Sequence, residues 1–295
     1  MREVAIGARP REAASSRVHL TRTVVLYGAM IVLAVIFMLP FYWTIVTSFK
    51  SPDEIYIFPP EWLPAVPQWF NYVQVWQVVP YGHFVINSVT VAVLGGIGQV
   101  GSATIVAYGF ARFRFPGRDF LFLLTLGTLI LPAEVLLVPT FLLFKYLGWL
   151  NTLAPLIIPH YFGGGAFFIF LLRQFFLSLP RDFDEAAKID GAGPLKILWS
   201  VLMPLAKPAL ATAAILSFLG RWNEFLQPVI YLNSPDRLTL AVGISYFELE
   251  GSLGGKPLTQ LLMAAALMMA LPCIVLFFVG QRYFVQGVTL SGIKG

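Results

Sequence analysis

The chain has 295 residues, of which 58% are hydrophobic and only 12% charged, and its mean hydropathy is +0.77. This composition lacks the polar surface of a soluble globular protein and indicates an integral membrane protein. A single cysteine, Cys273, excludes an intrachain disulfide, and three scattered histidines offer no metal-ligand spacing, so we expect neither redox nor metal chemistry.

Six apolar stretches approach or exceed the roughly 20 residues that a helix needs to cross the hydrocarbon core. They lie near Val24–Val46, Phe84–Tyr108, Phe120–Leu142, Leu150–Leu172, Pro208–Leu232 and Leu261–Gly280. Helices rather than strands follow from this length and from the need to satisfy backbone groups within each segment. We therefore predict an all-α integral membrane protein with six transmembrane helices, in which Pro132 and Pro272 cause local bends rather than breaks.

The basic residues predict the orientation of these spans. Of the 20 lysines and arginines, fifteen fall on one side if the amino terminus is inside, Arg221 falls within a span, and four fall on the other side: Lys50, Lys145, Arg237 and Lys256. This asymmetry follows the positive-inside rule and places both termini in the cytoplasm. The net charge of +5 thus reflects topology rather than nucleic-acid binding. We expect a cytoplasmic segment 1–23, a transmembrane domain 24–283 and a cytoplasmic tail 284–295.

Two longer segments join the spans on the outer side. Residues 51–83 are rich in Pro, Trp and Tyr, which favour the membrane interface, so we expect a lid along the outer surface. Residues 233–260 contain Pro235 and several glycines. They are either a flexible element that meets a partner or substrate, or a plain connector.

Two glycine motifs resemble nucleotide-binding loops but lie in unsuitable contexts. Gly96–Gly101 matches G-x-G-x-x-G, yet it falls within the second span, where close helix packing explains it better than a dinucleotide site. Gly251–Pro257 resembles a phosphate loop, but its first glycine is one place out of register and Pro257 replaces the hydroxyl residue that would meet magnesium. We therefore expect no ATP hydrolysis by this chain and no cofactor bound to it.

The cytoplasmic stretch 180–206, between predicted spans four and five, contains a regularly spaced pattern. Glu185-Ala186-Ala187 is followed by Lys188, Ile189, Asp190 and then Gly191, and Pro204 ends the later sequence Val201-Leu202-Met203-Pro204. Pro180 can open a short helix, the acidic residues after it complement the positive helix end, and Gly191 can terminate it.

A second helix can start at Pro194, so the stretch predicts a helical elbow that projects from the membrane. The apolar run that we expect to anchor this elbow consists of Leu195, Ile197, Leu198 and Trp199. An ordinary amphipathic connector is the alternative, and the complete spacing argues against it.

This spacing resembles the EAA loop by which membrane subunits of ABC importers dock onto their ATPases, with Val201 and Met203 as conservative departures. Other segments extend the resemblance over most of the chain: Phe58-Pro59-Pro60-Glu61-Trp62, Asn87-Ser88, Pro132-Ala133-Glu134-Val135, Trp222-Asn223-Glu224-Phe225, Phe284-Val285-Gln286-Gly287 and Gly292-Ile293-Lys294-Gly295. Together they are similar to the MalG-type inner-membrane permease of maltose and multiple-sugar ABC importers.

The resemblance implies a type I ABC importer permease fold with a cytoplasmic EAA coupling helix, and a non-catalytic role in ATP-driven carbohydrate import. It implies these partners: a homologous second permease, two cytoplasmic ATPases that use ATP and Mg, an extracytoplasmic sugar-binding protein, and the sugar itself. The location would be a bacterial or archaeal cytoplasmic membrane. The ATPase-coupling residues implied are Glu185, Ala186, Ala187, Asp190, Gly191 and Pro204.

Ionisable side chains within the predicted spans are candidates for the translocation path or its gate. Glu134, Arg221 and Glu224 would each cost roughly 2.5–3.5 kcal/mol near the bilayer centre if exposed to lipid, so they should face protein or water. A structural ion pair or interhelical clamp is the alternative, since Arg221 and Glu224 share a helix face. For sugar hydroxyls the neutral candidates are Asn87 and Asn223, with Trp222 as a stacking partner.

A proton-coupled secondary transporter is the alternative function, with Glu134 or Glu224 as the proton relay. Inverted repeats or broken helices in matched halves would favour it, and the sequence shows neither clearly.

Overall fold

The computed structural model describes residues 11–248 and 258–291, and all regular secondary structure in these ranges is helical. Side chains are described for residues 22–132, 134–248 and 258–281. The predicted segments 1–23 and 284–295 lie partly outside these ranges, and Gly251–Pro257 lies wholly outside them. The helices are α1 (Arg11–Ser48), α2 (Asn71–Val78), α3 (Tyr81–Arg112), α4 (Arg118–Gly127), α5 (Leu137–Tyr146), α6 (Ala154–Ile157), α7 (Ala166–Ser178), α8 (Asp182–Ile189), α9 (Pro194–Ile197), α10 (Met203–Leu205), α11 (Lys207–Trp222), α12 (Leu226–Tyr231), α13 (Leu240–Gly243) and α15 (Thr259–Ser291).

The described part of the chain contains four to six helices that could span a membrane. Four stretches are long and apolar enough to cross singly: Arg22–Ser48, Tyr81–Arg112, Ala154–Ser178 and Thr259–Gln281. Two bent pairs raise the number to six if each pair is one span: Arg118–Ile130 with Glu134–Tyr146, and Pro194–Leu205 with Lys207–Trp222. The all-α membrane architecture predicted from the sequence is thus confirmed.

The third predicted span, Phe120–Leu142, is broken rather than bent at Pro132. A 3-10 turn extends α4 to Ile130, Leu131 is extended with φ −76° and ψ 119°, and the next helical stretch runs at 89° to the first. Proline lacks an N–H, and its ring disfavours a helical conformation at the preceding residue. The predicted local bend was therefore wrong here, whereas α15 continues through Pro272 as a helix.

The fifth predicted span, Pro208–Leu232, is divided at Asn223. Helix α11 ends at Trp222 and α12 begins only at Leu226. The side-chain Nδ2 and the backbone N of Asn223 both donate to the Leu219 carbonyl, at 2.8 and 3.2 Å. Such competition from a short amide side chain favours helix ends. Residues 223–225 thus form a junction where the sequence predicts helix.

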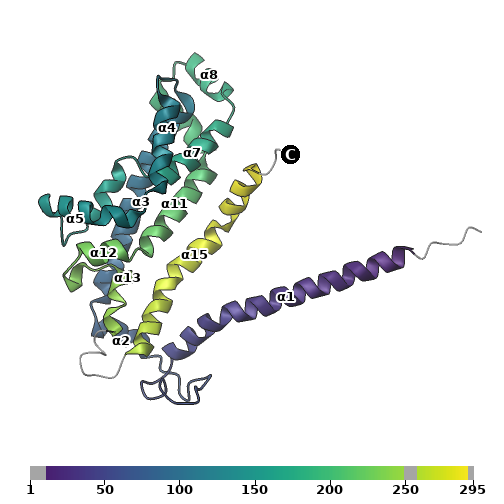
Figure 1. The fold of residues 1–295 in the computed structure, drawn as a ribbon, viewed down its shortest axis with the longest axis vertical. Coiled ribbons are helices and arrows are strands. Elements are labelled where there is room, and N and C mark those ends of the chain that lie inside the picture. Colours follow the sequence, from purple (N-terminus) through teal and green to yellow (C-terminus); the bar gives the residue numbers. More distant parts are fainter. Residues whose placement is uncertain (1–10, 249–257, 292–295) are drawn as a thin grey trace, which may run out of the picture.

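Helix α3 is the central element of the bundle. It packs against α7 and α11 and runs from the end that carries α8 to the end that carries α2 and α13 (Figure 1). We call these the elbow end and the far end. Helix α1 diverges from the bundle and packs against α15, and its side chains from Val24 to Leu39 are exposed (Figure 1). A helix this apolar must face lipid or another membrane subunit.

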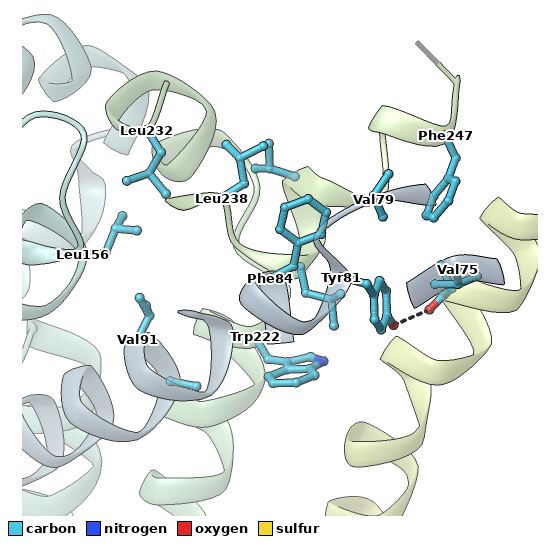
Figure 2. Close-up of a cluster of buried hydrophobic side chains, with 14 of the residues drawn as sticks. Val75, Val79, Tyr81, Phe84, Val91, Leu156, Trp222, Leu232, Leu238 and Phe247 are labelled. Carbon is cyan, nitrogen blue, oxygen red and sulfur yellow. Dashed lines mark hydrogen bonds between the residues drawn. The ribbon is translucent and has the colours of Figure 1, made fainter. Parts of the chain in front are cut away.

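Two hydrophobic cores lie along α3, one at each end of the bundle. The far-end core gathers Tyr81, Phe84, Trp222 and Phe247 among others (Figure 2), and Tyr81 Oη donates to the Ala265 carbonyl of α15 at 3.1 Å. The elbow-end core consists of residues from α3, α4, α7, the elbow and α11: Ala103, Ala107, Tyr108, Ala111, Phe122, Ile169, Leu172, Phe176, Ile197, Leu198, Leu202, Ala206, Ala209 and Ala213. The elbow is therefore part of the bundle's packing rather than a loose connector.

The G-x-G-x-x-G run of α3 is a helix-packing surface, as predicted. An added Cβ at Gly98 would overlap the ring of Tyr161, and Ser102 Oγ donates to the His160 carbonyl at 3.0 Å. Small residues allow this close approach between the two segments. Gly98 therefore serves packing within the bundle, whereas an added Cβ at Gly101 would meet no atom within 4 Å.

Candidate functional site

The elbow begins with helix α8 at Asp182. Its first turn contains Asp182, Asp184 and Glu185, and Lys188 lies in its last turn. Acidic groups near the amino end and a basic group near the carboxyl end both complement the helix dipole. The sequence of this stretch therefore stabilises a short helix locally, and the predicted start after Pro180 is confirmed.

A Schellman motif ends α8 at Gly191. Gly191 N donates to the Lys188 carbonyl at 3.0 Å, and Ala192 N donates to the Ala187 carbonyl at 2.9 Å. Gly191 has φ +75°, which is strained for any residue that carries a Cβ. Asp190 is the C-cap residue, and its N–H bonds the Ala186 carbonyl at 3.1 Å. The predicted termination at Gly191 is thus confirmed.

After Pro194 the elbow returns to the bundle through a π turn. Helix α9 is followed by the π turn Leu198–Leu202 and by α10, which contains Pro204. Pro204 has no N–H to bond the Ser200 carbonyl, which accords with the departure from α-helical bonding here. Helix α11 then starts at an angle of 83° to this arm of the elbow.

The elbow exposes apolar side chains at the end of the molecule. Ala186 is exposed, and Ile189 is 87% exposed. Of the four residues predicted to anchor the elbow, Ile197 and Leu198 are buried, but Leu195 and Trp199 are 66% and 58% exposed, so that prediction was half wrong. The apolar side chains on this projecting surface indicate a site that another protein or the membrane interface covers.

Two side chains of α3 hold the elbow against the bundle. Arg112 Nη2 lies 3.3 Å from Asp184 Oδ2, without hydrogen-bond geometry, and donates to the Leu179 carbonyl at 3.1 Å. Tyr108 Oη donates to the Pro194 carbonyl at 3.1 Å. The groove of about 170 Å³ beside these contacts is also lined by Glu185 and Lys188.

Neither Tyr108 nor Arg112 was predicted from the sequence as a contact of the elbow. Arg112 counted only toward the positive-inside rule, and Asp184 only as one of the acidic residues that complement the helix dipole. A basic residue that ends one span and an acidic residue that begins the elbow are a signal that could have suggested the pair.

Within the bundle, a polar cluster of Gln99, Ser217 and Arg221 joins α3 to α11. Arg221 Nη2 and Ser217 Oγ both donate to Gln99 Oε1, at 2.8 and 2.7 Å. Gly95 leaves room for the guanidinium, since an added Cβ there would lie 3.2 Å from Arg221 Nε. The cluster is thus an interhelical clamp built on Arg221. The sequence predicted such a clamp as the alternative to a role in the translocation path.

A pocket of about 240 Å³ lies beside this cluster. Its polar lining residues are Gln99, His160, Ser217, Arg221, Glu224 and Gln227, and the rest of the lining is glycine or apolar. Glu224 Oε1 accepts a hydrogen bond from Gln227 N at 3.2 Å, and no ion pair between Glu224 and Arg221 is present among the described residues. The partner of Arg221 is therefore the amide of Gln99. Polar groups around such a pocket can bond hydroxyl groups of a ligand.

The other residues predicted for the path or gate lie elsewhere. Trp222 is 2% exposed, stacks on Phe218 and donates from Nε1 to the Met269 carbonyl at 3.0 Å. Glu134 is exposed in a 3-10 turn, and the pocket beside Arg221 does not include it. Asn223 is exposed directly after α11, and its Nδ2 donates to the Leu219 carbonyl of α11 and to Cys273 Sγ of α15, at 2.8 and 4.0 Å. Of the six residues predicted for the path or gate, the structure thus brings only Arg221 and Glu224 together at one pocket.

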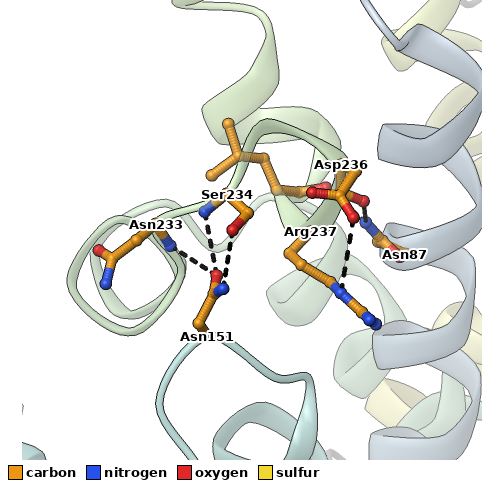
Figure 3. A network of polar contacts seen from close by, with 7 residues as sticks. Asn87, Asn151, Asn233, Ser234, Asp236 and Arg237 are labelled. Carbon is orange, nitrogen blue, oxygen red and sulfur yellow. Dashed lines mark hydrogen bonds and ion pairs between the residues drawn. The ribbon is translucent and has the colours of Figure 1, made fainter.

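At the far end, Asn87 holds the segment that follows α12. Its Nδ2 donates to the carbonyls of Asp236 and Leu238, at 2.9 and 3.0 Å (Figure 3). Asn151 holds the same segment from another side, because its Oδ1 accepts from Ser234 N at 3.0 Å (Figure 3). Side-chain hydrogen bonds from Asn87 and Asn151 therefore hold the described part of segment 233–260 against the bundle, which argues against a plain connector.

The chain matches known membrane transport proteins along most of its length. Residues 99–290 match the model of the family described as binding-protein-dependent transport system inner membrane component. The probable ABC transporter permease protein YurM of Bacillus subtilis is 32% identical over 87% of this chain and 83% of its own length. The diacetylchitobiose uptake system permease protein NgcG of Streptomyces coelicolor is 37% identical over 75% of this chain and 73% of its own.

A solved structure shares the fold. The crystal structure of a bacterial ABC transporter involved in the import of the acidic polysaccharide alginate contains a chain with a TM-score of 0.79 and 26% identity, covering 95% of this chain and 100% of that one.

Proposed function

Because the chain belongs to the family of binding-protein-dependent transport system inner membrane components, it is a non-catalytic permease subunit of an ATP-driven carbohydrate importer, and we propose how its parts divide that work. The elbow formed by α8 and α9 is the contact for a cytoplasmic ATPase. The far end then faces the outside, where an extracytoplasmic sugar-binding protein delivers the substrate. A homologous second permease completes the translocation path.

The observation that carries the ATPase contact is the projecting helix α8 with its capped end. Glu185, Ala186 and Asp190 are exposed on it, and Ala187 packs back on the bundle. Small Ala186 permits a close approach by a partner backbone, and exposed Ile189 supplies an apolar contact. Gly191 and Pro204 shape the elbow rather than touch the partner.

The basic residues support the orientation. The elbow carries Lys188 and Lys196, and most arginines and lysines of the chain lie on its side of the predicted spans. We therefore place the elbow and both termini in the cytoplasm, with each bent helix pair counted as one of six spans in a cytoplasmic membrane. ATP and Mg belong to the partner ATPases, and this chain binds no cofactor itself.

For the translocation path we propose the pocket beside Arg221 and Glu224. Its polar groups come from α3, α11, the junction after α11, α12 and the turn before α7, so a relative movement of these segments would change its shape. Asn87 and Trp222 support the path from outside the pocket through their bonds to the far-end segment and to α15. Asn223 and Glu134 remain exposed candidates for the gate.

Site-specific photocrosslinking tests the ATPase contact. In a Cys273→Ser background, Ala186→Cys carries a thiol-reactive photocrosslinker, and Val66→Cys, 63% exposed in the segment before α2, is the matched control. Irradiation of the assembled complex should join only the Ala186 position to the ATPase subunit. An equal yield from both positions, or none from Ala186, would contradict the proposed contact.

A further inference from the structure

The last turn of α3 holds the elbow at three points. Tyr108 and Arg112 are four residues apart and so share one face of the helix. Arg112 donates to the Leu179 carbonyl before α8 and forms an ion pair with Asp184 inside α8, and Tyr108 donates to the Pro194 carbonyl at the start of α9. We call this set of contacts the inner clamp. It fixes the residue before α8, helix α8 itself and the start of α9 to one side of α3.

The inner clamp is buried. The side chains of Arg112 and Asp184 are 7% and 10% exposed. Separating such a pair would leave an unpaired charge out of water, which is strongly unfavourable. A displacement of the elbow against α3 therefore meets a barrier, and a small displacement of α8 moves the end of α3 with it.

The opposite end of the same helix holds the far-end segment. Asn87 Nδ2 donates to the Asp236 and Leu238 carbonyls, and Ser88 Oγ accepts from Leu240 N at 2.7 Å (Figure 3 for Asn87). Ser88 is 1% exposed. We call these contacts the outer clamp. It fixes residues 236–240 to α3.

Helix α3 joins the two clamps without interruption. It is a single helix of 32 residues with no proline inside it, and Ser88 and Arg112 lie about 36 Å apart along it at 1.5 Å per residue. Helix α11, which follows the elbow in sequence, is separated from it by a π turn and an 83° bend. Of these two helices, α3 is therefore the stiffer link between the elbow and the far end.

We propose that α3 is a transmission helix, in which Tyr108, Arg112, Asn87 and Ser88 are positioning residues that couple the far-end segment to the elbow. The inference rests on the proposed function, because it takes the elbow as the ATPase contact and the far end as the side of the binding protein. Occupancy of the far end is then communicated to the ATPase through a movement of α3, and ATPase closure is communicated back along the same helix.

The test uses the complete transporter in lipid nanodiscs and measures how far sugar-loaded binding protein stimulates its ATPase. Arg112→Met opens the inner clamp and Asn87→Leu opens the outer clamp. Each should lower the stimulation about 5-fold or more, while the ATPase still co-purifies. The double variant should be no lower than the worse single variant, because one interrupted link cannot be interrupted twice.

Matched controls are Arg114→Gln and Thr90→Val. Arg114 has no polar partner among the described residues, and Thr90 bonds only the Ile86 carbonyl of its own helix. Both controls should retain the parent stimulation. The exchange Arg112→Asp with Asp184→Arg should restore part of the stimulation lost in Arg112→Met, which keeps a folding defect distinguishable from a lost link.

Two results would overturn the inference. Losses that multiply in the double variant would mean that the clamps act independently, and parent-level stimulation in both single variants would mean that neither clamp transmits. A parent complex whose ATPase does not respond to the loaded binding protein would instead overturn the proposed function, and the inference with it.

Discussion

Arg112 in the last turn of α3 forms a buried ion pair with Asp184 of α8, across 72 positions of sequence, with Nη2 and Oδ2 3.3 Å apart. Their side chains are 7% and 10% exposed, so solvent screens the pair weakly. The pair is the main buried contact of α8 with the transmembrane bundle, because Asp184 is the only buried residue that α8 contributes.

The free energy of unfolding should fall when one charge of this pair is removed and should largely recover when both are removed. Asp184→Leu leaves Arg112 buried and unpaired and should lower the free energy of unfolding by about 3 kcal/mol. Arg112→Met combined with Asp184→Leu should recover most of that loss, because no buried charge remains. Chemical unfolding in detergent micelles measures both. A double variant no more stable than Asp184→Leu alone would contradict this explanation.

The conformation of Gly191 should be needed for ATPase binding but not for membrane insertion. Gly191→Val forces a β-branched residue to φ +75°, at a cost of about 1–2 kcal/mol, and should weaken ATPase association about 5- to 30-fold. Gly193→Val is the matched control, since Gly193 has φ −72° and no atom within 4 Å of an added Cβ. Co-purification with the ATPase measures the effect. Equal association of both variants would show that the Schellman motif is dispensable.

Glu185→Lys should act at the partner surface instead of on the fold. Glu185 is exposed in the first turn of α8, so its reversal opposes the helix dipole by only about 0.3–1 kcal/mol. The isolated subunit should keep its unfolding midpoint, while ATPase association and transport fall. Asp182→Lys, in the same turn and also exposed, is the control for the dipole. Equal losses in the two variants would mean that Glu185 makes no specific contact.

Local signals in the sequence predicted the local structure well. The acids at the start of α8 and the glycine at its end act through neighbouring backbone groups, so their effect could be read from spacing alone. Pro132 was underestimated because the cost of a proline depends on whether neighbouring helices can satisfy the freed backbone groups. The end of α11 at Trp222 was not predicted, because apolar residues continue beyond Asn223 as far as Leu232.

Contacts between distant segments could not be predicted in this way. Arg112 and Asp184, Gln99 and Arg221, and Ser88 and Leu240 are separated by 72, 122 and 152 positions, and each pair meets only because of how α3 packs. The charge of Arg221 correctly indicated a group that needs a partner within the membrane. Its actual partner is the neutral Gln99. The sequence could not predict this partner, because Glu224 lies on the same predicted helix face as Arg221 and was the nearer candidate.

Removing the amide partner of Arg221 should be more harmful than removing the hydroxyl beside it. Gln99→Leu deprives the guanidinium of its 2.8 Å bond and should lower the free energy of unfolding by about 1.5–3 kcal/mol, the range for bonds to charged groups. Ser217→Ala removes only a donor to the same Oε1 and should cost about 1 kcal/mol. Unfolding of the two variants in detergent compares them. A larger loss in Ser217→Ala would contradict the clamp as described.

Transport by this chain should require ATP and its partner subunits. The elbow provides a docking surface, and the G-x-G-x-x-G run is occupied by helix packing at Gly98 and is therefore no nucleotide loop. Vesicles containing the chain alone should neither accumulate sugar nor hydrolyse ATP, whereas the full complex should do both. The secondary-transport alternative makes the opposite prediction, because Glu134 or Glu224 would then carry protons. Uptake by the isolated chain under a proton gradient, abolished by Glu224→Gln or Glu134→Gln, would overturn the ATP-driven function.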